Sequence, residues 1–236
     1  MKTMIALPHG YASQDRRYPA LYLLHGWNGD YKNWITLTNL IAYSERYPMM
    51  IVMPDAENSW YVNSAADRNF ADYIIEDLIS EIDSRYRTIT APHRRAIAGL
   101  SMGGYGAMRF ALKHPNVFAV AGSISGAFSG PSGIEQVMPE VSESVDIAFG
   151  PGNSSLRNDN DLAQLLKKAE PSALPYLFLT CGSQDPLLSC NRSFVSALSS
   201  MQLPYEYHES PGAHTWEFWD SSLPRLLEAV ASKVMA

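Results

Sequence analysis

Short, almost continuously apolar runs alternate with longer amphipathic segments along most of the chain. Runs of this kind are typical of parallel strands that are buried on both faces. The segments between them repeat apolar residues at helical spacing, as Phe70, Ile74 and Leu78 do. The pattern predicts strands at residues 20–24, 49–53, 96–100, 117–124, 176–181 and 205–208, and helices at about 33–46, 68–86, 103–114, 160–169, 191–201 and 216–235.

This alternation predicts an α/β fold with a mostly parallel, doubly wound sheet and helices on both faces. The run at 205–208 alternates polar and apolar residues, so we expect it nearer an edge of the sheet. We expect residues 1–236 to form a single domain. The Gly-, Ser-, Pro- and Asn-rich stretch at about 126–158 has no clear period and is either a small lid or a surface excursion.

The composition limits the classes of partner. Hydrophobic residues make up 46% of the 236 residues, which is enough for a substantial core. The net charge of −6 argues against nucleic acid, which usually binds a basic patch. No apolar run approaches the ~20 residues that cross a bilayer, and the first residues do not form a signal peptide. We therefore expect no membrane partner and a cytoplasmic location, unless a leader has been removed. Cys181 and Cys190 are expected to be free thiols.

The most informative short motif is the Gly-x-Ser-x-Gly pentapeptide at residues 99–103. Between a predicted strand and a predicted helix, this motif is typical of the nucleophile elbow of α/β-hydrolases, a sharp turn that exposes a serine hydroxyl. Glycines flank the serine because the turn is tight and the helix passes close to neighbouring strands. The pentapeptide alone is a weak signal, so Ser101 is a candidate nucleophile only together with its surroundings.

A serine hydroxyl needs a base to accept its proton and a third group to orient that base. In α/β-hydrolases these groups follow the serine in the order Asp or Glu, then His. Asp185 and His214 each lie in a loop after a predicted strand, in this order. Asp55 also follows a strand but precedes the serine, so we expect a structural role for it. The sequence thus predicts Ser101, Asp185 and His214 as a catalytic triad.

Further residues are candidates for the rest of such a site. An oxyanion hole needs two backbone N–H groups, and we assign them to Met102, directly after the serine, and to Trp27, in the loop after the first long strand. Trp60, Tyr61 and Trp216 are candidate walls of a substrate pocket. The histidines lack the spacing of metal ligands, so no metal is expected.

Together these motifs resemble the esterase D/putative esterase family of α/β-hydrolases, especially its small tributyrin-esterase-like members. The resemblance runs from about residue 10 to residue 219 and rests on five stretches: residues 17–26, 86–88, 98–107, 181–185 and 212–216. It implies an α/β-hydrolase fold and a cofactor-free serine carboxylesterase that acts on small-molecule esters through an acyl-enzyme. It also implies the triad and the oxyanion hole named above.

The family includes feruloyl and acetyl-xylan esterases, S-formylglutathione hydrolases and mycolyl transferases. Short-chain acyl or aryl esters are therefore the expected substrates, with acyl transfer to an alcohol or sugar and non-catalytic binding as alternatives. Family members usually carry one or two more strands before residues 8–11. We expect a sheet shortened at that edge, or an incomplete sequence, and an exposed edge would favour a homo-oligomer.

Overall fold

The computed structural model describes residues 1–236, apart from the side chain of Ser132. Its core is a seven-stranded sheet in the order β1-β3-β2-β4-β5-β6-β7. All neighbouring strands are parallel except β1, which pairs antiparallel with β3. This confirms the predicted mostly parallel α/β sheet. The strands are β1 (Thr3–Ala6), β2 (Ala20–Leu24), β3 (Met50–Pro54), β4 (Arg95–Leu100), β5 (Val120–Ile124), β6 (Tyr176–Gly182) and β7 (Tyr205–Ser210).

The two faces of the sheet have separate hydrophobic cores, which explains the continuous apolar runs. In β2, Leu21 and Leu23 pack on one face, whereas Tyr22 and Leu24 pack on the other. All four side chains are buried. Because both faces are covered, polar residues are excluded from both side-chain directions of the central strands.

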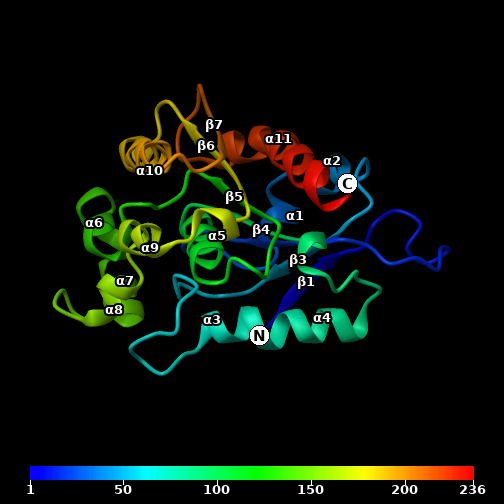
Figure 1. The fold of residues 1–236 in the computed structure, drawn as a ribbon, viewed down its shortest axis with the longest axis horizontal. Helices are drawn as coiled ribbons and strands as arrows, with labels where there is room; N and C mark the ends of the chain where they lie inside the picture. Colours follow the sequence, from blue (N-terminus) through cyan, green and yellow to red (C-terminus); the bar gives the residue numbers. More distant parts are fainter.

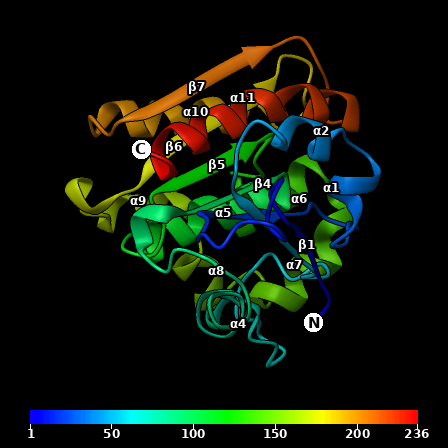
Figure 2. The same cartoon turned by 90° about the vertical axis from the view of Figure 1, so that its right-hand side faces the viewer.

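Helices cover the two faces as a doubly wound sheet requires (Figures 1 and 2). One face carries α1 (Asn33–Thr36), α2 (Leu40–Ser44) and α11 (Trp216–Val234), and α11 lies over β4, β5 and β6. The other face carries α5 (Met102–Lys113), α9 (Leu162–Lys168), α10 (Leu188–Ser200) and a long helix made of α3 (Phe70–Asp72), the π-helical η1 (Tyr73–Leu78) and α4 (Ile79–Arg85). Short 3₁₀ turns, η2 (Pro92–Arg94) and η4 (Pro171–Ala173), precede β4 and β6.

Several element boundaries differ from the sequence-based expectation. The strand β1 was not predicted; it is only four residues long and half-buried, so it has little apolar pattern. The expected helix at 33–46 is divided into α1 and α2, because the Thr38 hydroxyl accepts the Leu40 N–H (3.2 Å) and bonds the Trp34 carbonyl. The expected strand at 117–124 begins only at Val120, since Val117 closes a turn onto the His114 carbonyl.

The stretch at 126–158, hereafter the 126–158 segment, was expected to be a small lid or a surface excursion, and it is largely helical. It contains α6 (Gly130–Val137), η3 (Pro139–Val141), α7 (Ser142–Phe149) and α8 (Ser155–Asp159), which lie together at one side of the sheet (Figure 1). The buried Arg157 side chain joins them by ion pairs with Glu135 (2.9 Å) and Asp146 (2.6 Å) and by a hydrogen bond to the Gly150 carbonyl (3.0 Å).

Cys181 and Cys190 are both free thiols. None of the described helices combines the length and the hydropathy needed to span a membrane.

Candidate active site

Ser101 lies at the sharp junction between β4 and α5. Its backbone has φ 52° and ψ −116°, in a region that L-residues rarely adopt. The flanking glycines are required by space. A Cβ on Gly99 would lie 2.5 Å from the Gly103 carbonyl carbon, and a Cβ on Gly103 would lie 2.5 Å from the Leu24 carbonyl oxygen. Only glycine allows this close approach of strand and helix, so the pentapeptide forms the strand-to-helix elbow expected from the sequence.

The structure brings Ser101, His214 and Asp185 into one hydrogen-bonded chain. The Ser101 Oγ lies 3.0 Å from His214 Nε2, and His214 Nδ1 lies 2.9 Å from Asp185 Oδ2. A carboxylate accepts hydrogen bonds, so Nδ1 carries the proton and Nε2 is free to accept from the serine hydroxyl. This is the tautomer that a general base next to a nucleophilic serine needs.

The loops that carry the acid and the base are bound to each other by main-chain hydrogen bonds. Ser183 N–H donates to the Ser210 carbonyl (2.9 Å), and Gln184 N–H donates to the Gly212 carbonyl (2.9 Å). A Cβ on Gly182 would lie 2.2 Å from the Gly212 carbonyl oxygen, so the two loops are in direct backbone contact. This contact fixes the position of Asp185 relative to His214, although they lie 29 residues apart.

Asp185 is held as a carboxylate. Burial alone would raise its pKa, but the hydrogen bond and electrostatic attraction of His214, together with the hydrogen bond from the Leu187 N–H, hold the pKa below its usual value. Asp185 Oδ1 accepts a hydrogen bond from the Leu187 N–H at 2.8 Å, and Oδ2 accepts one from His214 Nδ1, so both oxygens have partners. A fixed, ionised carboxylate can orient the imidazole and stabilise its positive charge.

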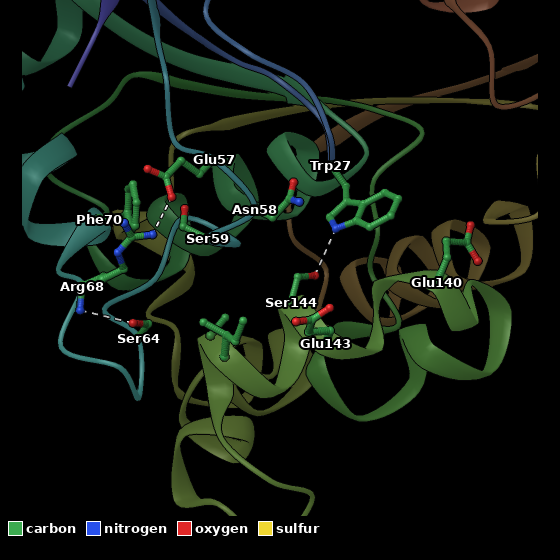
Figure 3. A pocket seen from close by; sticks show the side chains of 12 residues that line it. Trp27, Glu57, Asn58, Ser59, Ser64, Arg68, Phe70, Glu140, Glu143 and Ser144 are labelled. Atoms are coloured by element: carbon green, nitrogen blue, oxygen red, sulfur yellow. Dashed lines mark hydrogen bonds and ion pairs between the residues drawn. The ribbon is translucent and has the colours of Figure 1, made fainter.

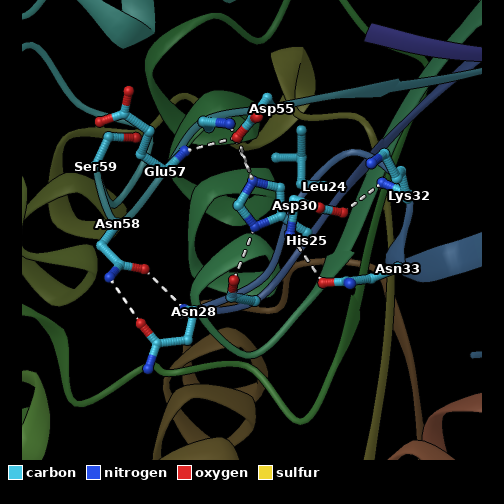
Figure 4. A network of polar contacts seen from close by, with 12 residues as sticks. Leu24, His25, Asn28, Asp30, Lys32, Asn33, Asp55, Glu57, Asn58 and Ser59 are labelled. Carbon is cyan, nitrogen blue, oxygen red and sulfur yellow. Dashed lines mark hydrogen bonds and ion pairs between the residues drawn. The ribbon is translucent and has the colours of Figure 1, made fainter. Parts of the chain in front are cut away.

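The loop after β2, residues 25–29, makes a network of polar contacts (Figure 4). A Cβ on Gly26 would lie 3.5 Å from the Ser101 Cβ, so this backbone runs beside the elbow. The Gly26 carbonyl accepts from Gly29 N–H (3.0 Å) and from His25 Nδ1 (2.8 Å). A trans peptide group is planar, with its C=O and N–H pointing in opposite directions. Fixing the Gly26 carbonyl therefore also fixes the direction of the Trp27 N–H.

His25 is the anchor of this loop. Its Nε2 accepts the Ala56 N–H (3.0 Å), so the neutral ring is protonated at Nδ1, which donates to Gly26. Burial lowers the pKa of His25, against the opposing effects of the Gly26 carbonyl and of Asp55. The Asp55 carboxylate lies 3.8 Å from His25 Nε2 and accepts a hydrogen bond from the Glu57 N–H (3.2 Å). These contacts are consistent with the structural role expected for Asp55.

A second contact holds the other end of the loop. Asn28 N–H donates to Asn58 Oδ1 (2.7 Å), and Asn58 Nδ2 donates to Asn28 Oδ1 (3.0 Å), as Figure 4 shows. Asn28 has φ 57°, a conformation that asparagine tolerates better than most residues. Residues 25–29 are thus held at both ends.

The two residues expected to supply oxyanion-hole N–H groups are close to Ser101: Met102 follows it in the chain, and Trp27 lines the same cavity. Met102 is the first residue of α5, where N–H groups have no partner within the helix. Trp27 N–H has no acceptor among the described residues. An oxyanion hole needs two such donors directed at one point beside the serine hydroxyl.

A cavity of about 220 Å³ opens onto the serine. We call it the inner pocket; Ser101, His214, Leu100, Met138, Trp216 and Trp219 are among its lining residues. Trp216 therefore lies where a substrate wall was expected. Trp219 is buried and also packs edge-on against the His214 ring, with centroids 4.9 Å apart.

The expectation that Trp60 and Tyr61 wall this pocket is wrong. Their side chains are 1% and 0% exposed, and neither lines the inner pocket. Trp60 packs against Tyr105 and Phe149, whereas the Tyr61 hydroxyl donates to the His25 carbonyl (2.9 Å). Both aromatic rings face the core beneath the site.

A second cavity, the outer pocket, has a volume of about 350 Å³ and lies between the loop after β3 and the 126–158 segment (Figure 3). Its lining is mixed: apolar Phe70 and Ile147 lie near the ion-paired Glu57 and Arg68. No pattern in the sequence predicted this cavity, because its two sides come from segments about 80 residues apart.

The roles of His25 and of Ser144, which lines the outer pocket, were also missed. The position of His25 directly before Gly26, in a loop after a strand, was the available signal. For Ser144 the sequence carried none. Among the described residues, no three His, Cys, Asp or Glu side chains form a group that could hold a metal ion.

Comparison with known proteins places this geometry in a family. The model of the family described as "Putative esterase" matches residues 1–230. An acetyl esterase of Caldicellulosiruptor saccharolyticus is 30% identical over 216 residues, which cover 88% of this chain and 81% of that protein.

Solved structures of similar proteins have the same fold. The fluorophosphonate-binding serine hydrolase F of Staphylococcus aureus superposes with a TM-score of 0.88 at 27% identity, covering 97% of this chain and 91% of that one. A ferulic acid esterase superposes with a TM-score of 0.83 at 25% identity, covering 98% and 91%. With the parallel sheet, the elbow and the match over residues 1–230, these similarities show that the chain is a serine hydrolase of the α/β-hydrolase fold and belongs to the Putative esterase family.

Proposed function

We propose that this protein hydrolyses short-chain acyl or aryl esters, of the acetyl or feruloyl type, through an acyl-enzyme on Ser101. The observation that carries the proposal is the chain of two hydrogen bonds from Ser101 through His214 to Asp185, at 3.0 and 2.9 Å. The acetyl esterase and ferulic acid esterase among the similar proteins support these two kinds of acyl group.

In the proposed first step, Ser101 Oγ attacks the ester carbonyl carbon while His214 Nε2 takes the hydroxyl proton. The carbonyl oxygen gains negative charge and accepts hydrogen bonds from the backbone N–H groups of Trp27 and Met102. Asp185 stabilises the imidazolium that forms. His214 then gives its proton to the alcohol oxygen as the carbon–oxygen bond breaks, which leaves the acyl group on Ser101.

In the second step water replaces the alcohol. His214 Nε2 takes a proton from the water as its oxygen attacks the acyl carbon, and the same N–H groups stabilise the second tetrahedral intermediate. Return of the proton to Ser101 Oγ releases the carboxylic acid and restores the enzyme. Each step uses groups of this chain only.

The size of the inner pocket supports a small acyl group. Its volume of about 220 Å³ lies below the ~300–1,000 Å³ usual for drug-sized ligands. We also propose that residues 1–236 act as one domain in which the 126–158 segment forms a wall of the site, since Met138 lines the inner pocket.

The test is a panel of p-nitrophenyl acetate and butyrate, methyl ferulate and acetylated xylose, assayed with the wild-type protein and with Ser101→Ala. We expect turnover of the small esters by the wild type and a loss of about 10⁶-fold in kcat in the variant, which removes the nucleophile. Added alcohol or sugar distinguishes acyl transfer, because a transferase would form a new ester instead of the free acid. Equal turnover by the variant would contradict the proposal.

A further inference from the structure

Trp27 lies at both the inner and the outer pocket. It is the one residue, among those described, that lines both the inner and the outer pocket. The inner pocket is also lined by Ser101 and His214, and the outer pocket is also lined by Ser144 and Ile147. The inner pocket of about 220 Å³ and the outer pocket of about 350 Å³ therefore meet at Trp27.

The hydroxyl of Ser144, in α7, holds the indole in this position (Figure 3). Trp27 Nε1 donates to Ser144 Oγ at 3.1 Å. The same oxygen accepts Trp60 Nε1 at 3.1 Å and donates to the Val141 carbonyl at 2.7 Å. A serine hydroxyl has one donor and two acceptor sites, so its hydrogen-bonding capacity is filled.

The two indoles that donate to Ser144 differ in burial. Trp60 is 1% exposed and is packed against Tyr105 and Phe149, with ring centroids 5.8 and 6.1 Å away. Trp60 and the Val141 carbonyl therefore hold the hydroxyl in place. Trp27 is only half-buried, and its indole depends on this hydroxyl for the only hydrogen bond that it makes among the described residues.

The direction of proton transfer determines which half of an ester faces the Trp27 indole. The departing oxygen must receive a proton from His214 Nε2, so the alcohol half lies on the side of His214 and Trp216. The acyl half extends away from that side, into the part of the inner pocket that Met138 and Trp27 line. The outer pocket is lined by neither His214 nor Trp216, and it begins behind Trp27. An acyl chain that outgrows the inner pocket would therefore reach the Trp27 indole.

From this geometry, and resting on the proposed esterase function, we propose that Ser144 is a specificity-determining residue: its hydroxyl holds the Trp27 indole as a wall that limits the length of the acyl chain. When the wall is released, the two cavities join and longer acyl groups enter the outer pocket. The apolar side chains Phe70, Ile147 and Ala148 are available there to contact them.

The experiment compares kcat/KM for p-nitrophenyl butyrate and p-nitrophenyl octanoate. For the wild type we expect butyrate to be preferred by at least about tenfold, the order of discrimination that a pocket of fixed size gives. In Ser144→Ala the preference falls by about tenfold, because the indole loses its acceptor. Trp27→Ala keeps the backbone N–H and removes the wall, so it shows the same change even if Ser144→Ala fails to fold.

The matched control is Ser142→Ala. Ser142 lies in the same helix, and its exposed hydroxyl donates only to the Pro139 carbonyl (2.8 Å), so the butyrate preference should stay at the wild-type value. A wild type that hydrolyses octanoate as fast as butyrate, or a preference unchanged in both Ser144→Ala and Trp27→Ala, would overturn the inference. A wild type without turnover of any ester would overturn the proposed function, and the inference with it.

Discussion

Ser101 is held in a backbone conformation that costs on the order of 1–3 kcal/mol for a residue with a side chain. Main-chain hydrogen bonds maintain it: Ser101 N–H donates to the Ile124 carbonyl (3.0 Å), and the Ser101 carbonyl accepts the Ala127 N–H (3.1 Å). Both partners belong to β5 or to the loop that follows it. The strained turn therefore depends on the neighbouring strand, and it directs the hydroxyl to His214.

Asp185→Asn gives a prediction at this scale. Asparagine has the same shape and can still accept the Leu187 N–H, so the variant should fold. Its side chain is neutral and can present an N–H to His214, which favours the wrong tautomer. We expect kcat to fall by about 10⁴-fold with little change in KM.

The control is Asp55→Asn, which changes a carboxylate near the site that lies outside the hydrogen-bonded chain. It should keep most of the activity. If steady-state kinetics showed Asp185→Asn to be as active as Asp55→Asn, the assignment of Asp185 would fail.

Single residues were predictable where a motif or chain order constrained them. The pentapeptide and the order serine, acid, base singled out Ser101, Asp185 and His214, which the structure brings together. Trp60 was misplaced because aromatic character does not reveal whether a side chain faces a pocket or the core. The contact between Ser144 and Trp27 joins residues 117 positions apart, and no local pattern encodes such a pair.

At the scale of elements, the central strands were predictable because both of their faces are covered, so each is an uninterrupted apolar run. The strand β1 was missed because it is a half-buried edge strand of four residues. The helices of the 126–158 segment were missed for another reason. Their sequence is rich in helix-breaking residues, and they are held by tertiary contacts such as those of Arg157 rather than by local propensity.

For the whole molecule, the buried His25 and the half-buried His114 predict how the free energy of unfolding depends on pH. Burial lowers the pKa of His25, and burial together with Arg109 and Lys113 lowers that of His114. In the unfolded chain both take up protons near the ordinary histidine pKa of about 6.5. The unfolded state then binds more protons than the folded state, so stability decreases as the pH falls below about 6.5.

For the fully buried His25, the free energy of unfolding should fall by up to about 1.4 kcal/mol per pH unit in this range. Urea unfolding at pH 7.5 and at pH 5.5 measures this decrease in the free energy of unfolding. In His114→Gln the decrease should be smaller than in the wild type, whereas replacing the exposed His93 by Gln should leave it unchanged. A wild type that is equally stable at both pH values would contradict the neutral, buried state of His25.

The central claim is that His214 and Asp185 make the Ser101 hydroxyl nucleophilic, and covalent labelling tests it most directly. The protein is treated with a fluorophosphonate probe, and the modified residue is identified by peptide mass spectrometry. We predict a single label, on Ser101. Labelling should be absent in Ser101→Ala and strongly slowed in His214→Ala. Absence of labelling in the folded wild-type protein, or a label on a different serine, would contradict the account.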